Sequence, residues 1–79
     1  MNEDKEKWFE LQLSVVRWHL DAAVSASGER ARTHIQKARE AHAQTCGSVA
    51  HAGLGKAVQE RLEKECSELR ARLDAASRS

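Results

Sequence analysis

Three residues in the middle of the chain have the types and spacing of a metal site. His42, Cys46 and His51 form the pattern H-x3-C-x4-H. On a helix, His42 and Cys46 would lie one above the other and could both bind one metal ion, with His51 folding back as a third ligand. The competing interpretation is that His42 and Cys46 are half-buried structural residues near a helix end. We favour this second interpretation and expect neither a metal nor another cofactor.

The spacing of His42 and Cys46 is similar to one fragment of the site in helical copper-sensing repressors. The similarity covers these two residues, and no cysteine precedes Cys46 to supply the further upstream ligand of that site. What the resemblance implies is a metal-responsive regulator, which we keep as an alternative function.

The chain has two cysteines, Cys46 and Cys66. If a helix ends near Cys46 and a turn follows, Cys66 lies about ten residues beyond the turn on an antiparallel helix. That is roughly 15 Å along the axis at 1.5 Å per residue. A disulfide requires Cα atoms within about 7 Å of each other. We therefore expect two free thiols.

Basic residues flank the middle segment and could contact phosphates. Arg30, His34 and Lys37 fall along one flank, and Arg32 and Arg39 fall along the other. The formal net charge is only +1, acidic residues are interspersed, and no aromatic side chain is nearby for base stacking. We read these flanks as solvated helix faces and expect no nucleic-acid binding, which stays an alternative.

Catalysis has little support in the sequence. The seven serines are spread along the chain, and none occupies a nucleophile turn or has an ordered acid–base partner. The carboxylates alternate with Lys and Arg at helical spacing, which is typical of exposed faces. We expect that the protein is not an enzyme.

The elements that position these residues are predicted to be helices. The chain has 79 residues, no Pro, no Tyr and one Phe, and 32% of its residues are charged. This composition favours helices over strands and predicts an all-α fold. A chain of this length forms one domain, residues 1–79, with a core so small that oligomerisation is a common remedy.

The most apolar segment, residues 8–26, carries two apolar stripes at helical spacing. The first stripe is Trp8, Leu11, Val15, Trp18 and Ala22, and the second is Phe9, Leu13, Val16, Leu20 and Val24. One packing partner needs an apolar arc of about 100°, so an arc twice as wide predicts at least two partners.

The first helix is expected to run continuously over about residues 3–46. An apolar repeat at 4-3 spacing stays in phase from Val24 through Gly28 and Ile35 to Val49. On this interpretation Gly28 is a small residue in a helix interface. The alternative is a break at residues 27–28, where Ser27 and Gly28 are typical of a helix end, and this gives a three-helix variant.

A turn is predicted over residues 47–54, because residues 47–55 contain three of the four glycines. The last helix, about residues 55–77, is apolar on one side and should pair with the first as an antiparallel hairpin. The predicted intrachain core comprises Leu13, Leu20, Val24, Ile35, Val58, Leu62, Leu69 and Leu73.

The first stripe is left without a partner in the chain. Exposed Trp and Leu side chains favour association, so we expect a homodimeric helical bundle. Arg17 lies on the same helix, and Trp and Arg are enriched in binding hot spots. The interface prediction is therefore Trp8, Leu11, Val15, Arg17, Trp18 and Ala22.

The function predicted from this surface is a small interaction module that regulates, inhibits or serves as an adaptor for a larger protein. A purely structural, self-assembling subunit is a further alternative. The acidic start of the chain and the absence of a run of about 20 apolar residues predict a cytoplasmic protein without membrane contact.

Overall fold

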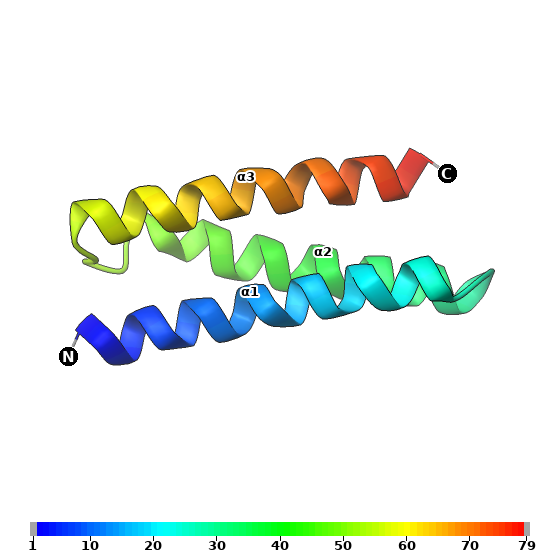
Figure 1. The fold of residues 1–79 in the computed structure, drawn as a ribbon, viewed down its shortest axis with the longest axis horizontal. Helices are drawn as coiled ribbons and strands as arrows, with labels where there is room; N and C mark the ends of the chain where they lie inside the picture. Colours follow the sequence, from blue (N-terminus) through cyan, green and yellow to red (C-terminus); the bar gives the residue numbers. More distant parts are fainter. Residues whose placement is uncertain (1, 79) are drawn as a thin grey trace.

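The computed structural model describes residues 2–78, with side chains from Asp4 onward, and consists of three helices. They are α1 (Asn2–Ser25), α2 (Glu29–Val49) and α3 (Lys56–Arg78). Figure 1 shows them packed side by side, with α2 antiparallel to both α1 and α3. The predicted all-α class is confirmed, in its three-helix form. None of these three helices is both long and apolar enough to span a lipid bilayer.

The expectation of one continuous helix through Gly28 is wrong. α1 ends at Ser25, and Gly28 has φ 60° and ψ −132°, a conformation that residues with a Cβ rarely adopt. A Cβ at Gly28 would meet no atom within 4 Å. Glycine is therefore needed here for backbone geometry and not for a close helix contact, and the chain turns back at this point.

The core forms where one face of each helix meets the other two. α1 contributes Phe9, Leu13, Val16 and Leu20; α2 contributes Ala38, His42, Thr45 and Val49; α3 contributes Leu62, Cys66, Leu69 and Leu73. All of these are buried. The α1 and α3 faces are mainly large and aliphatic, while α2 presents smaller side chains, so the three surfaces interdigitate. Of the other predicted core residues, Val58 and Ile35 are half-buried.

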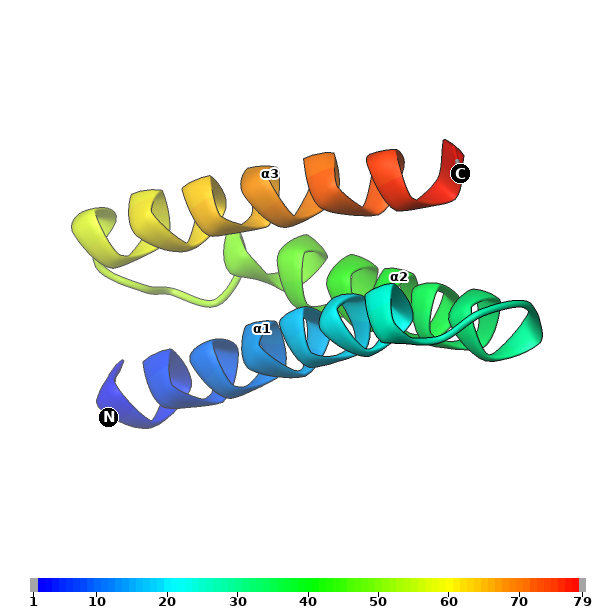
Figure 2. The same cartoon turned by 45° about the vertical axis from the view of Figure 1, so that its right-hand side comes forward.

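The α2–α3 connection is a loop that shifts α3 along the bundle axis. α2 continues to Val49, three residues past its expected end, so Gly47 lies inside the helix. The loop over residues 50–55 then carries the chain beyond the end of α2 before α3 begins (Figure 2). Leu54 is buried in the core, and Lys5 Nζ donates to the Ala52 carbonyl at 3.0 Å. The loop is thus fixed against the start of α1.

This shift brings Cys46 and Cys66 together in a disulfide, so the expectation of two free thiols is wrong. The Cα atoms are 6.0 Å apart. Cys46 lies three residues before the end of α2 and Cys66 ten residues into α3, a mismatch of about 10 Å on adjacent helices. Residues 50–52 form a turn at the end of α2, and the three residues that follow can span about 10 Å, so the loop supplies the missing displacement.

Val24 is 81% exposed, so the prediction that it belongs to the core is also wrong. The C-terminal end of α3 reaches the level of Leu20 and Ile35, which line a hollow together with Ser77. Val24 lies one helical turn beyond Leu20, toward the α1–α2 turn. Among the described residues, α3 does not extend over that end of the bundle.

Candidate interaction surface

Four apolar side chains form a continuous exposed surface along α1. Trp8, Leu11, Val15 and Trp18, here called the α1 stripe, are 48%, 61%, 36% and 61% exposed. Their 3-4-3 spacing places them on one side of the helix. The core-facing residues of α1 occupy another side and are buried, so the described residues of this chain leave much of the stripe uncovered.

Two residues predicted with the stripe are placed differently. Ala22 is half-buried and continues the same side of α1. Arg17 is directed to the opposite side, where Nη2 donates to Ser14 Oγ at 3.2 Å and Nη1 lies 3.7 Å from Glu65 of α3. The helical angle between Arg17 and Trp8 accounts for this, since nine residues at 100° put them on opposite sides. Arg17 therefore belongs to the contact between α1 and α3.

That contact is lined by ion pairs. The pairs are Arg61 with Glu6 and Glu10 at 2.6 and 2.9 Å, Arg17 with Glu65 at 3.7 Å, and Arg72 with Asp21 at 2.9 Å. All of them lie at the surface, where solvent screens the attraction between the charges. Together they give α1 a charged border along α3 and separate the α1 stripe from the third helix.

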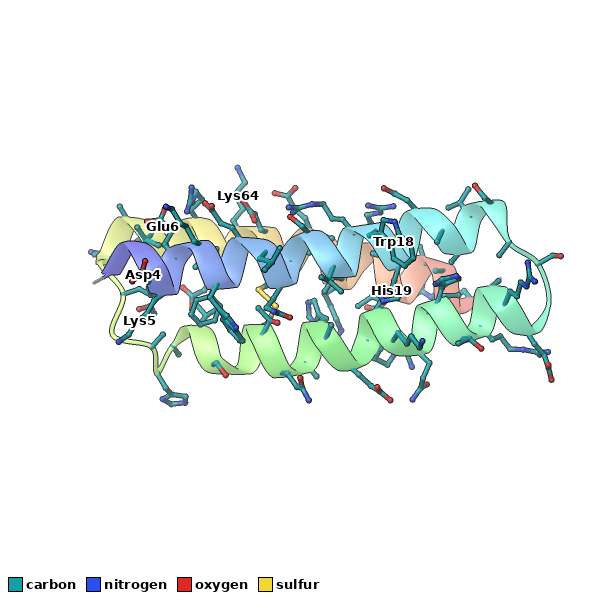
Figure 3. The ribbon with its side chains drawn as sticks, turned by 90° about the horizontal axis from the view of Figure 1, so that it is seen from below. Asp4, Lys5, Glu6, Trp18, His19 and Lys64 are labelled. Atoms are coloured by element: carbon teal, nitrogen blue, oxygen red, sulfur yellow. A yellow bond between two sulfur atoms is a disulfide. The ribbon has the colours of Figure 1, made fainter. Side chains whose placement is uncertain are left out.

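On the other side, Trp18 borders a pair of histidines that joins α1 to α2. His19 Nδ1 lies 3.0 Å from His34 Nδ1, and the Trp18 ring packs edge-on against both, with centroids 4.9 and 5.6 Å away. Figure 3 shows Trp18 on the outer side of α1 and His19 between α1 and α2. One Nδ1 must donate and the other accept, so the contact requires at least one neutral ring.

The environment of His19 disfavours its protonation. Burial lowers the pKa of His19 from its ordinary 6.5, and the positive charges of His34 and Lys37 lower it further. The sequence pattern did not indicate this pair, because a continuous helix through Gly28 would hold His19 and His34 far apart. Once the chain turns back between α1 and α2, residues at similar distances from the two helix ends face each other. His19 lies six residues before the end of α1 and His34 five residues after the start of α2.

The three proposed metal ligands do not form a site. Cys46 is bonded to Cys66, so its sulfur is not available as a thiolate ligand. His42 is buried, and its Nε2 donates to the Cys66 carbonyl at 2.8 Å. His51 is exposed in the loop after α2. Across the described part of the chain, no group of three or more His, Cys, Asp or Glu residues could hold a metal ion.

The basic flanks of α2 are mixed with acidic and polar groups. Arg39 donates to Ser77 of α3, which directs it along the bundle. Arg32 and Lys37 line a shallow surface with Glu29 and Glu40. The acidic side chains reduce the positive potential of this surface, which is typical of a solvated helix face.

One feature of the surface was not predicted from the sequence. An open hollow of about 710 Å³ lies near the α1–α2 turn. Apolar side chains including Leu20, Val24 and Ile35 line it, with Arg32 and Arg39 at its border. The hollow lies where α1 and α2 extend beyond the described part of α3. Its position therefore depends on where the first two helices are separated by a turn.

No family model matches this chain, and neither a curated protein nor a solved structure shows significant similarity to it.

Proposed function

We propose that this protein is a non-catalytic interaction module and that the α1 stripe is its binding surface. One observation carries the proposal: both tryptophans of the chain lie in one exposed apolar stripe on a helix whose core side is already buried. Burying a large apolar side chain contributes roughly 1.5–3 kcal/mol. A protein chain that covers the stripe would gain this energy at several positions at once.

The surroundings of the stripe suit a binding role. Trp8 and Trp18 lie near its two ends, and tryptophan is enriched among residues that dominate binding energy. The ion pairs with α3 border one side and the His19–His34 pair borders the other. An apolar centre with a polar border is the usual composition of a protein interface.

Other contacts on the surface support a non-catalytic role. The hydroxyls of Ser14 and Ser48 donate to carbonyl oxygens of their own helices, Glu10 and Gln44, at 2.9 Å. These bonds are those of ordinary helix serines and do not activate a nucleophile. We accordingly propose a regulator, inhibitor or adaptor that acts by binding.

The proposal is tested by comparing which proteins are captured by matched variants. Trp18→Glu places a charge in the stripe, whereas Val24→Glu places the same charge at a more exposed apolar position off the stripe. Each variant is used as bait in a source-cell extract, and its helicity is checked by circular dichroism. Tagged wild-type chain is added to the extract. Wild type and Val24→Glu should capture the same proteins, including the tagged chain, and Trp18→Glu should capture none of them. Identical capture by all three proteins would reject the proposed surface.

A further inference from the structure

The α1 stripe is self-complementary about its own midpoint. Trp8 and Trp18 are each five residues from Leu13, and Leu11 and Val15 are each two residues from it. A two-fold axis at the level of Leu13 therefore places Trp8 against Trp18 of a second copy, and Leu11 against Val15 of that copy, when the two α1 helices run antiparallel. We infer that the α1 stripe is covered by the α1 stripe of a second copy in this antiparallel register.

Charges beside the stripe favour the same register. Lys7 and Asp21 are both exposed and lie on the same flank of α1, the flank nearer α3, where the Asp21 side chain pairs with Arg72 and is still 71% exposed. A two-fold axis perpendicular to the antiparallel helices places the α3-side flank of one α1 next to the α3-side flank of the other, and the two helices run in opposite directions. Lys7 of one copy then lies about 3 Å along the axis from Asp21 of the other, at 1.5 Å per residue. The antiparallel dimer gains two such pairs.

A parallel arrangement lacks these advantages. It would bring both N-terminal ends together, and Lys7 would no longer face Asp21 of the second copy, since opposite flanks then meet. Antiparallel helices also have opposed dipoles, which is the more favourable electrostatic arrangement. Charge and shape therefore select the same orientation.

The size of the stripe sets the expected strength of the dimer. Stable interfaces bury about 1,200–2,000 Å² in total, and an aromatic side chain buries about 150–250 Å². The four stripe residues of each copy are only 36–61% exposed before association, so their contact alone buries less area than this range. The dimer should therefore be weak and dissociate on dilution.

This inference rests on the proposed function, because it names the occupant of the same surface. Sedimentation velocity over a range of concentrations is the first test. Wild type and Val24→Glu should dimerise alike, and Trp18→Glu should dimerise at least about tenfold more weakly, as expected for a hot-spot residue. Lys7→Glu and Asp21→Lys should each weaken the dimer several-fold, and the double variant should recover most of the loss.

Cross-linking separates the two orientations. Because the native cysteines are bonded to each other, an introduced cysteine is the only free thiol. With a short bismaleimide, Ser14→Cys should link two copies, since these residues lie about 3 Å apart along the axis. Ala22→Cys should not, since its two copies are separated by about 27 Å in the antiparallel register. Efficient linking through Ala22→Cys instead would overturn the inferred register.

The outcomes also separate this inference from the proposed function. A wild-type chain that stays monomeric at several hundred micromolar refutes the second copy as occupant. If Trp18→Glu then still loses bound proteins that Val24→Glu retains, the stripe remains a binding surface for a different chain. If capture is unchanged as well, both proposals are wrong.

Discussion

At the scale of single residues, the contact between His19 and His34 gives the bundle a defined dependence on pH. The bond between their Nδ1 atoms needs a neutral ring, and protonation of both rings would place two donors and two positive charges face to face. The contact lies next to Trp18, so its loss would also affect one end of the α1 stripe.

The pKa of His19 predicts the sign of this dependence. It is lowered in the folded protein relative to 6.5, so at mildly acidic pH the unfolded chain binds more protons than the folded one. The free energy of unfolding should therefore fall as the pH is lowered from about 7.5 to about 5.5 and level off below the folded pKa. Urea denaturation of wild type, His19→Gln and the exposed-loop control His51→Gln measures this. His19→Gln should show a shallower fall than the other two, and equal slopes in all three would contradict the assigned role.

At the scale of the helices, two glycines with opposite roles explain how the chain divides. Gly28 has a positive φ and ends the α1–α2 turn, whereas Gly47 lies inside α2 and a Cβ there would meet nothing within 4 Å. The sequence shows both only as glycines. Their different roles depend on the backbone conformation of each segment.

Replacing each glycine by alanine should change stability in opposite directions. Gly28→Ala forces a residue with a Cβ into a left-handed conformation and should destabilise the fold by about 1–2 kcal/mol. Gly47→Ala improves helix propensity and should stabilise it by about 0.5–1 kcal/mol. Thermal and urea unfolding of both variants are the measurements. If Gly28→Ala were as stable as Gly47→Ala, the chain would pass through residue 28 as a helix.

The disulfide between α2 and α3 should contribute substantially to stability. It closes a loop of 20 residues, which corresponds to about 3 kcal/mol of stabilisation through loss of unfolded-chain entropy. Paired Cys46→Ala and Cys66→Ala substitution should lower the melting temperature by more than 10 °C, at about 4–8 °C per kcal/mol. Alkylation of unreduced protein should modify neither cysteine. Modification of both would show that the thiols are free.

At the scale of the whole molecule, residue pattern was enough to predict some features and not others. The all-α class and the buried residues Leu13, Leu62, Leu69 and Leu73 follow from composition and helical periodicity. The exposed side of α1 follows from the same periodicity, because three helices of this length cannot cover two α1 stripes.

The features that were missed depend on where the helices end. A turn at Gly28 and a loop that displaces α3 determine the Cys46–Cys66 bond, the His19–His34 contact and the exposure of Val24. Each depends on the axial positions of residues on different helices, and these positions change by about 1.5 Å for every residue added to a helix. The cytoplasmic location stays a prediction.

The most direct test of the account measures whether the α1 stripe becomes covered in solution. Both tryptophans of the chain lie in the stripe, so intrinsic fluorescence reports on this surface alone. Acrylamide quenching should be strong in dilute protein and should decrease as the concentration rises into the micromolar range, in wild type and Val24→Glu alike. Strong quenching that is independent of protein concentration would contradict coverage by a second copy.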